Sequence, residues 1–189
     1  MPTPPKLVVL NGLPAAGKLT ILRAVAAQLP SPILLDNHQL IDPVATVLPE
    51  RGEAHYALRR AVQAPIFAAL RGRLLAGGTA LLSACFSDDD VGTGLMEDHL
   101  AIAGSDIELV WVNAVCPPDV LRARVGSETR KSGGKNKLTD VGVLERMMSA
   151  TLARPPEAPN VRVAELDVSG ALDESVARLM EIAGLSAPS

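Results

Sequence analysis

Short apolar runs alternate with longer stretches of helical periodicity along the 189 residues of the chain. The apolar runs predict five strands, at residues 6–11, 33–35, 79–86, 107–115 and 161–166. Between them the periodicity predicts helices at residues 18–29, 40–48, 52–76 and 91–103, from Pro117 onward, and at about 139–152 and 171–183. Continuous apolar strands that alternate with helices are typical of a parallel sheet covered on both faces. The pattern therefore predicts an α/β fold in which all strand carboxyl ends share one edge, where ligands bind.

The longest helical stretch, residues 52–76, contains a proline. Pro65 falls inside it, so we expect a kink or a break near Gln63 or Ala64, and Pro43 likewise breaks the short helix before it. His55 and His99 stand outside any motif, so we place both at the surface. The apolar face of the long helix is predicted from Leu58, Val62, Ile66, Leu70 and Leu74.

The composition narrows the function classes. Hydrophobic residues make up 48% of the chain, enough for a sizeable core, but aromatic residues make up only 2%. So few aromatic side chains argue against a stacking platform for single-stranded nucleic acid. The net charge of −3 gives no global attraction to nucleic acid or to acidic membranes. Nucleic acid is therefore a less favoured partner than a small molecule.

The length of the chain and its apolar runs indicate the number of domains and whether a segment could cross a membrane. A chain of this length predicts a single domain over residues 1–189. The sequence shows no targeting segment and no apolar stretch of the roughly 18 residues needed to span a bilayer, so we expect a cytoplasmic monomer or homodimer. Cys85 and Cys116 end apolar runs without metal-ligand spacing, and we expect buried free thiols there.

The residues with recognisable chemistry begin with the stretch KLVVLNGLPAAGKLT, residues 6–20. A buried strand, a glycine-bearing turn and a helix follow one another, and the spacing Gly12-x4-Gly17-Lys18 fits a Walker A phosphate-binding loop. Glycines let successive N–H groups converge on one anion, and the helix adds the partial positive charge of its N-terminus. Lys18 can reach the outer phosphates. The residues expected to bind nucleotide are Gly12, Leu13, Pro14, Ala15, Ala16, Gly17, Lys18, Leu19 and Thr20.

One residue departs from this pattern. The residue after the lysine is expected to be Ser or Thr, whose hydroxyl binds magnesium, but Leu19 stands there and the hydroxyl comes one residue later, at Thr20. One helical residue turns a side chain by about 100°, so Thr20 cannot simply replace it, although it can bond the α-phosphate. Leu19 can instead point into the core. It also leaves open a purely structural strand-to-helix turn with Lys18 at the surface.

Asp36, Asn37 and His38 follow the second predicted strand. A carboxylate at this edge can orient or deprotonate an acceptor hydroxyl, or hold Mg²⁺ through water. Asn37 and His38 can add hydrogen bonds to a substrate. The alternative is that Asp36 and Asn37 only cap the next helix.

Acidic residues, SDDD at 87–90, follow the third predicted strand. Because Leu19 offers no hydroxyl, an aspartate here can serve the metal together with Asp36, as a Walker B aspartate does. Asp88 is the preferred member because it is nearest to the strand end. Capping of the following helix explains the same residues equally well.

Residues 122–137 carry six positive side chains and one negative side chain in a chain of net charge −3. A glycine-bearing basic segment between two helices, about 122–139, is typical of a lid that closes over phosphates. Arginines stabilise the charge of a transferring phosphoryl group, so Arg122, Arg124 and Arg130 join Lys18 and Asp36 as candidate catalytic residues. A solvated flexible loop and a patch for nucleic-acid phosphates are the alternatives.

Ser169 and Gly170 follow the last predicted strand, in a loop of small residues where an adenine ring can lie against the backbone. Helix capping explains this loop equally well.

Together, the N-terminal Walker A loop, the aspartate after the second strand and the basic segment after the fourth resemble the small P-loop kinases. Gluconate kinase, shikimate kinase and the chloramphenicol phosphotransferase-like proteins share this plan. The GKLT loop with LLDNHQLIDP resembles, more narrowly, an AAA-like ATPase/kinase branch of that group. The resemblance covers nearly the whole chain. It implies a P-loop three-layer sandwich with strand order 2-3-1-4-5, and binding of ATP with Mg²⁺.

Three functions stay open at this point. The first is an ATP-dependent phosphotransferase that moves the γ-phosphoryl group to a small-molecule hydroxyl. The second is an ATPase or nucleotide-dependent switch, with nucleic acid as one conceivable partner. The third is a nucleotide-binding module without turnover.

Overall fold

A sheet of five parallel strands forms the centre of the computed structural model, which describes residues 4–127 and 138–186. The strands are β1 (Lys6–Gly12), β2 (Ile33–Leu35), β3 (Thr79–Ala84), β4 (Glu108–Val115) and β5 (Val161–Asp167). Their order is β2-β3-β1-β4-β5, and every neighbouring pair is parallel. The predicted α/β fold and strand order are confirmed.

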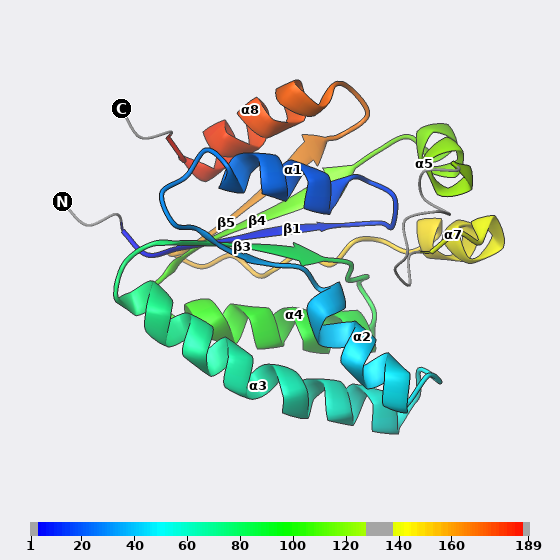
Figure 1. The fold of residues 1–189 in the computed structure, drawn as a ribbon, viewed down its shortest axis with the longest axis horizontal. Helices are drawn as coiled ribbons and strands as arrows, with labels where there is room; N and C mark the ends of the chain where they lie inside the picture. The colour runs from blue at the N-terminus through cyan, green and yellow to red at the C-terminus, as the bar shows by residue number, and fades with distance from the viewer. Residues whose placement is uncertain (1–3, 128–137, 187–189) are drawn as a thin grey trace.

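Helices cover both faces of the sheet, in three layers (Figure 1). One face carries α1 (Lys18–Ala26) and α8 (Leu172–Ala183). The other face carries α2 (His38–Val47), α3 (Glu53–Leu75) and α4 (Asp90–Ala103). Beyond the carboxyl ends of the strands lie α5 (Pro118–Gly126) and α7 (Val141–Met148). The chain therefore surrounds that edge of the sheet with helices from three directions.

Two apolar cores lie on the two faces of the sheet because side chains alternate along each strand. Leu7 and Val9 of β1 belong to the core beneath α3 and α4, whereas Val8 and Leu10 belong to the core beneath α1 and α8. All of β1 is buried. The loop that follows β1 thus starts from a fully buried strand.

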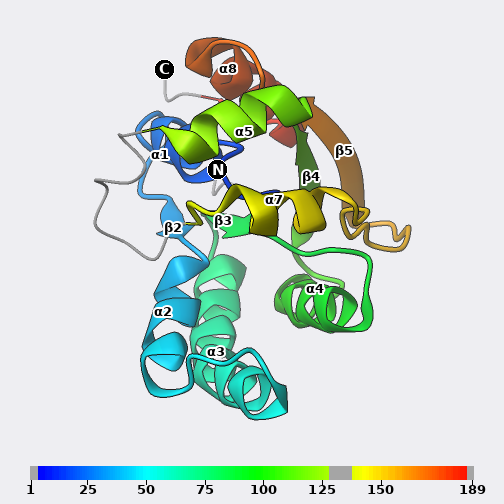
Figure 2. The same cartoon turned by 90° about the vertical axis from the view of Figure 1, so that its right-hand side faces the viewer.

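The strand register places the carboxyl ends of β1, β2 and β3 at nearly the same height along the sheet. Leu10 of β1 is level with Ser83 of β3, and Leu35 of β2 is level with Leu82. The chain therefore leaves β2, β3 and β1 along one edge, which Figure 2 shows end-on. With strands about 4.8 Å apart, the end of β2 lies about 10 Å from β1, with β3 between them.

The buried face of α3 differs from the predicted one. Leu58 and Val62 are only half-buried, and Ile66 is 39% exposed. The face that α3 buries consists of His55, Arg59, Gln63, Phe67, Leu70 and Leu74. The prediction is therefore right at the carboxyl-terminal end of the helix and wrong in its first half, where polar side chains spaced four residues apart take the inner positions.

Prolines do not break the helices. Pro43 lies inside α2 and Pro65 lies inside α3, and both helices continue through them. The break predicted at Pro43 is therefore wrong and α3 is unbroken, while the kink expected near Gln63 or Ala64 stays a prediction. A proline removes one backbone hydrogen bond. Buried side chains beside each proline, Val44 in α2 and Phe67 in α3, hold the turn against the core.

α1 ends at Ala26 rather than at residue 29, and two further elements, β3 and α7, end earlier for a shared reason. β3 ends at Ala84 rather than at residue 86, and α7 ends at Met148 rather than near residue 152. The reason is a tertiary pairing: Ser87 forms an antiparallel bridge with Leu152, and backbone groups on either side exchange hydrogen bonds of 2.8 and 3.0 Å. Each segment leaves its own element to pair with the other.

The surface placement of His55 and His99 is wrong, because each is only 1% exposed. The His99 ring makes edge contacts with Phe67 and Phe86, at centroid distances of 4.9 and 5.0 Å. Burial lowers the pKa of His99 to about 4; the hydrogen bond to the Leu95 carbonyl opposes this, and the charge of Arg59 adds to it. His99 is thus a neutral core residue at pH 7.

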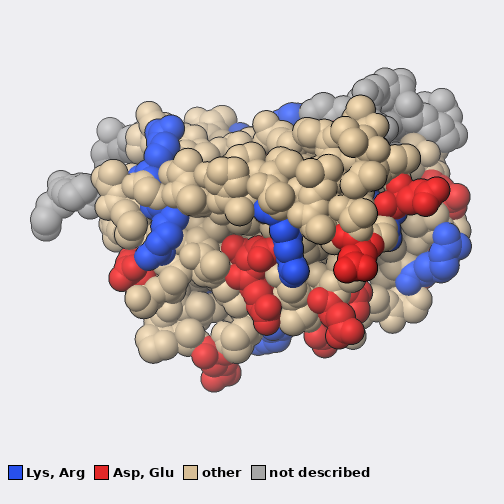
Figure 3. All heavy atoms as spheres, turned by 90° about the horizontal axis from the view of Figure 1, so that it is seen from below, with Lys and Arg blue, Asp and Glu red and all other residues tan. Residues whose placement is uncertain are grey.

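Cys85 and Cys116 are free thiols, as expected, but both are half-buried rather than buried. On the described part of the lower face, acidic and basic side chains are interspersed (Figure 3), a mixture with little net attraction for a polyanion. Within residues 4–127 and 138–186, no helix combines the length and the apolar composition that crossing a membrane requires.

Candidate functional site

The phosphate loop leaves β1 at a point where two backbones nearly touch. A Cβ on Gly12 would lie 2.8 Å from the carbonyl oxygen of Ala114 on β4, so only glycine fits there without displacing the sheet. Gly17 closes the loop at φ +84°, a conformation that side chains other than glycine rarely adopt. Ala15 also has a positive φ, of 67°. The local sequence thus produces the curled backbone of a phosphate loop.

The amino-terminal end of α1 suits an anion. Gly17 is its N-cap and provides no capping side chain, and the first turn contains no acidic residue. The helix dipole at this end therefore favours an anion, with no capping or acidic side chain of the turn competing for the position. Lys18 Nζ donates to the Gly12 and Leu13 carbonyls at 2.7 and 2.8 Å, so its ammonium group lies over the loop.

Asn11, directly before the loop, fixes its origin. Its side-chain amide donates to the Phe86 carbonyl at 3.1 Å and to Asn113 Oδ1 at 3.0 Å, and its Oδ1 accepts from the Phe86 N–H at 2.8 Å. Trp111 also donates to Asn113 Oδ1, at 3.0 Å. Buried hydrogen bonds thus tie the exits of β1, β3 and β4 together and hold the loop in place.

Leu19 does not fill the core as expected. It is half-buried, and the residues that α1 buries are Ile21, Leu22 and Val25. Thr20 is exposed. The first turn of α1 thus offers no hydroxyl where a Walker A loop has its Ser or Thr. The exposed Thr20 side chain is turned from that position by about 100° around the helix.

Asp36 lies at the end of β2 and is 9% exposed. Its Oδ1 accepts a hydrogen bond of 2.8 Å from the Ser83 hydroxyl on β3 and one of 3.4 Å from the His38 N–H. Ser83 Oγ in turn accepts from the Asn37 N–H at 3.0 Å. The capping alternative fails for Asn37, whose side chain makes no cap hydrogen bond to α2, but holds in part for Asp36, which accepts from the first N–H of that helix.

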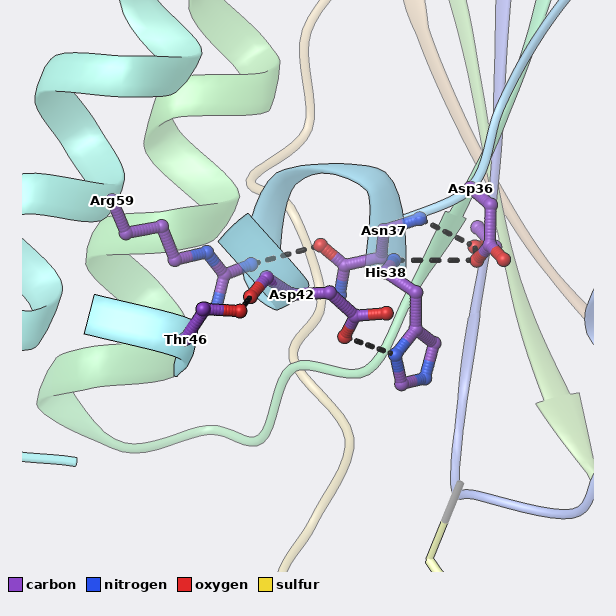
Figure 4. A network of polar contacts seen from close by, with 7 residues as sticks. Asp36, Asn37, His38, Asp42, Thr46 and Arg59 are labelled. Carbon is purple, nitrogen blue, oxygen red and sulfur yellow. Dashed lines mark hydrogen bonds and ion pairs between the residues drawn. The ribbon is translucent and has the colours of Figure 1, made fainter. Parts of the chain in front are cut away.

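Arg59 of α3 is the partner of the Asn37 side chain. Its Nη2 donates to Asn37 Oδ1 at 2.9 Å, and Figure 4 shows the guanidinium reaching from α3 toward the start of α2. Arg59 is 2% exposed. Burial and the nearby charge of Arg51 lower the pKa of Arg59 to about 10, so the side chain is still charged at neutral pH. Within the described residues its one printed hydrogen bond is to a neutral side chain, and a buried guanidinium of this kind can hold an anionic or strongly hydrogen-bonding ligand.

Sequence reasoning missed the polar stripe on α3 to which Arg59 belongs. Among the described residues, the buried side-chain atoms without a partner are His55 Nε2, Arg59 Nε and Gln63 Oε1, one from each successive turn of α3. Gln63 uses its Nε2 to donate to Asp98 at 2.7 Å. The only signal in the sequence was three polar residues four apart, a pattern that ordinarily indicates a solvated face.

His38 has an oriented imidazole. Its Nδ1 lies 3.0 Å from Asp42 Oδ1, one turn further along α2. Figure 4 places the imidazole and Asp36 on the side of the strands, whereas Arg59 approaches Asn37 from α3. The structure therefore brings the three predicted acceptor-side residues together and adds Asp42 and Arg59 to them.

Asp88 and its neighbours have two different surroundings. Asp89 is the N-cap of α4, where its carboxylate accepts from the Gly92 N–H at 2.7 Å; this bond, the Ser87 hydroxyl and the Val91 N–H lower the pKa of Asp89 against the opposing effect of burial. The capping alternative thus holds for Asp89. Asp88 is exposed, and its N–H donates to the Thr151 carbonyl. Among the described residues, no group of three or more His, Cys, Asp or Glu side chains is arranged to hold a metal.

The lid arginines have separate positions. Arg122 pairs with Glu145 of α7 through hydrogen bonds of 2.5 and 3.2 Å, on the exposed side of α5. Arg124 donates to the carbonyls of Val168 and Ser169, at 3.0 and 3.4 Å, beside Gly170. Arg130 lies outside the described residues, as does most of the predicted lid. Within the described part, these arginines join α5 to α7 and to the loop after β5.

No family model matches the sequence, and no curated protein matches it. Solved structures do match, over nearly the whole chain. A gluconokinase from Sinorhizobium meliloti 1021 is 17% identical, with a TM-score of 0.60 over 96% of this chain and 93% of that protein. A shikimate kinase from Bacteroides thetaiotaomicron is 20% identical, with a TM-score of 0.53 over 95% of this chain and 99% of that protein.

The tunicamycin resistance protein of Deinococcus radiodurans matches over 99% of each chain, at 15% identity and a TM-score of 0.63. At such identities the likeness is one of fold. The chain has the fold of these small P-loop kinases, with five parallel strands in the order β2-β3-β1-β4-β5.

Proposed function

We propose that this chain, which has the fold of small P-loop kinases, is an ATP-dependent phosphotransferase. It moves the γ-phosphoryl group of ATP to a hydroxyl of a small-molecule acceptor. One observation carries the proposal: an anion-ready phosphate loop and a buried polar cluster of Asp36, Asn37, Ser83 and Arg59 start from the same edge of the sheet.

ATP binds through its phosphates to the loop from Gly12 to Thr20, with Lys18 on the outer phosphates. The adenine lies against the backbone of Ser169 and Gly170, in the loop that Arg124 holds from α5. Arg122 is in an exposed ion pair, and such pairs contribute little to stability, so it can exchange Glu145 for phosphate. Arg130 is proposed as the third lid arginine on its sequence position alone.

The acceptor lies between the loop and α2. Asp36 accepts a hydrogen bond from the acceptor hydroxyl and orients it, while Asn37 and His38 add further polar contacts. Arg59, charged and buried, is supported as an anchor by its unpartnered Nε. An acceptor with several hydroxyl groups and an acidic or strongly polar substituent fits this set of groups.

Magnesium accompanies ATP in the proposal, and it neutralises charge on the phosphate oxygens. The donor set agrees with a weakly held ion: Leu19 contributes no ligand, and hydrated Mg²⁺ is commonly held by one or two carboxylates together with substrate phosphates. Asp36 and Asp88 are the carboxylates proposed for this role, through water. The proposal therefore includes a requirement for Mg²⁺. The concentration that half-saturates turnover should be higher than in a protein with Ser or Thr at position 19.

The test of function is ADP release from the purified full-length protein with ATP and Mg²⁺. Gluconate, shikimate and tunicamycin serve as acceptors, since these are the molecules that the names of the structural relatives suggest, and water alone is the reference. Release that an acceptor stimulates, with phosphate found on the acceptor by mass spectrometry, supports a phosphotransferase. Equal release with every acceptor and with water favours the ATPase alternative, and stimulation by nucleic acid would extend it.

The phosphate loop has its own test. Lys18→Ala should lower turnover by about 10²–10³-fold, because it removes the cation over the transferring group. Arg23→Ala is the matched control, since it removes an exposed cation from the same helix. Nucleotide binding and turnover that survive Lys18→Ala would overturn the central assignment.

A further inference from the structure

We infer that Ser83 is a positioning residue of the acceptor site, which holds one oxygen of the Asp36 carboxylate and leaves the other oxygen for the acceptor hydroxyl. The inference rests on the proposed phosphotransferase function and deepens it, because it says how the fold sets the direction of Asp36. Ser83 does not itself contact the acceptor in this account. Its effect on turnover therefore passes through Asp36.

Ser83 is the polar exception among the buried residues of its strand. It is 5% exposed, one residue before the end of β3. The other buried residues of β3 are apolar: Ala80, Leu81, Leu82 and Ala84. A hydroxyl costs free energy at such a position unless its hydrogen bonds are made. Because Leu35 of β2 is level with Leu82, Ser83 lies one step further toward the carboxyl edge, beside the point where Asp36 leaves β2.

The neighbours of the hydroxyl fix its direction. The Asn37 N–H donates to Ser83 Oγ at 3.0 Å, and an N–H can only donate, so the single hydroxyl hydrogen is left for Asp36 Oδ1, at 2.8 Å. The Asp36 N–H in turn donates to Gln39 Oε1 at 2.8 Å. Ser83 thus holds both the side chain of Asp36 and the peptide group that follows it.

The two oxygens of the Asp36 carboxylate have different surroundings. Oδ1 accepts from the Ser83 hydroxyl and, at 3.4 Å, from the His38 N–H. No group of residues 4–127 and 138–186 donates to Oδ2, and Oδ2 is not one of the enclosed polar atoms without a partner in that part of the chain. One oxygen is thus committed to the fold and the other is open at the carboxyl edge of the sheet. A carboxylate whose rotation is restrained in this way orients an acceptor hydroxyl before the reaction begins.

The experiment compares Ser83→Ala and Ser83→Thr with wild type in the ADP-release assay, with the acceptor that stimulates release most. Ser175→Ala is the matched control, since Ser175 is 4% exposed on α8 and its hydroxyl donates only to the Ala171 carbonyl. We expect Ser83→Ala to lower kcat/KM for the acceptor about 10-fold or more, with the Kd for ATP within about twofold, because ATP binds at the phosphate loop. Ser83→Thr keeps the hydroxyl and should retain most of the turnover, and Ser175→Ala should match wild type. Recovery of Ser83→Ala at high Mg²⁺ would assign its loss to the metal rather than to the acceptor, and would overturn the inference.

A double-variant cycle separates positioning from structure. Asp36→Ala removes the carboxylate through which Ser83 acts, so adding Ser83→Ala to it should change the remaining turnover less than about twofold. If the two losses multiply instead, Ser83 acts on turnover without Asp36, and the inference is wrong. Urea unfolding of the same samples shows whether each variant is folded under the assay conditions.

Crystal structures of wild type and Ser83→Ala give a readout that needs no acceptor. The Asp36 carboxylate should keep its place in wild type and turn from it in Ser83→Ala. An unmoved carboxylate in Ser83→Ala, or unchanged turnover with the acceptor, overturns the inference and leaves the proposed function standing. Wild-type protein that releases no ADP under any condition overturns the proposed function itself, while the crystal structures still test the hold of Ser83 on Asp36.

Discussion

On the phosphate-loop side of the sheet edge, the strand, the glycine turn and the helix that the local sequence predicts are all observed. β1 is apolar and buried, glycines stand where the backbone is crowded or has a positive φ, and α1 buries three apolar side chains. On the acceptor side, α3 buries His55, Arg59 and Gln63, while Leu58 and Val62 of the same helix are only half-buried. The two sides meet at one edge of the sheet, but the first buries the apolar residues that its sequence predicts, whereas α3 buries polar residues in its first half.

Under the proposed function, the difference reflects what each side binds. A phosphate is recognised by backbone N–H groups and a helix end, so a loop conformation is enough, and glycine and helix signals encode it. An acceptor is recognised by side chains held inside the fold. Burying a polar group without a partner costs free energy, and a chain keeps such groups mainly where they serve a site.

The largest expected effect that tests this comparison comes from Arg59→Met. Removing a guanidinium whose pKa is lowered to about 10, chiefly by burial, should leave the free energy of unfolding unchanged or raise it by about 1 kcal/mol. Acceptor-stimulated turnover should fall about 100-fold, through KM and kcat together. Urea unfolding and ADP release on the same sample check both statements.

Arg60→Met is the matched control, since it makes the same change at the next position, where the side chain is exposed and paired with Asp98. It should leave turnover at the wild-type level. A strongly destabilised Arg59→Met protein would show that Arg59 is structural, and the contrast between the two sides would then be lost.

His99 provides a pH-dependent effect on the acceptor side. Its pKa is about 4 in the folded chain against an ordinary value of 6.5, so the folded state holds the neutral form. The stability that depends on neutral His99 is complete above pH 6.5 and is lost as the pH falls toward 4. Between pH 7.5 and 4.5 this should remove about 2–3 kcal/mol from the free energy of unfolding.

Urea unfolding of wild type and His99→Leu at these pH values measures the contribution as a difference of differences. The variant should lose less stability on acidification than wild type does. Parallel curves for the two proteins would mean that His99 is not the group that titrates.

On the phosphate-loop side, Gly12→Ala should destabilise the fold by about 1–3 kcal/mol, because its Cβ would lie 2.8 Å from the Ala114 carbonyl oxygen. Gly72→Ala, inside α3 with open space around its Cβ position, is the matched control and should stabilise by about 0.5–1 kcal/mol. Thermal unfolding distinguishes the two. A Gly12→Ala protein as stable as wild type would show that the loop tolerates a side chain at its origin.

The smallest effect is expected at Arg122. Arg122→Ala should reduce turnover a few-fold and leave thermal unfolding unchanged, because its ion pair with Glu145 is exposed. Glu145→Ala breaks the same pair from the other end and should keep wild-type turnover. If Arg122→Ala and Glu145→Ala lose turnover equally, turnover depends on the ion pair rather than on the guanidinium itself, and the lid role proposed for Arg122 is wrong.

Sequence alone determined the sheet, its helices and the phosphate loop. The reason is locality: apolar runs, helical spacing and glycine positions act within a few residues, and a strand followed by Gly12-x4-Gly17-Lys18 needs no distant partner to form its loop. Asp36, Asn37 and His38 were found for the same reason, as polar residues directly after a predicted strand.

Tertiary structure decided the rest. Arg59 joins the proposed site only because α3 packs its polar stripe inward, and nothing within that segment encodes its contact with Asn37. Asp42 is a local partner of His38, four residues further along α2, and it comes into view once the helix is seen to begin at His38. β3 and α7 end early because residues 87 and 152 pair across a long stretch of sequence. The spacing of apolar and polar residues tells which residues share a face of a helix. Which face is buried depends on how whole helices and strands pack together, and in the first half of α3 the buried face is the polar one.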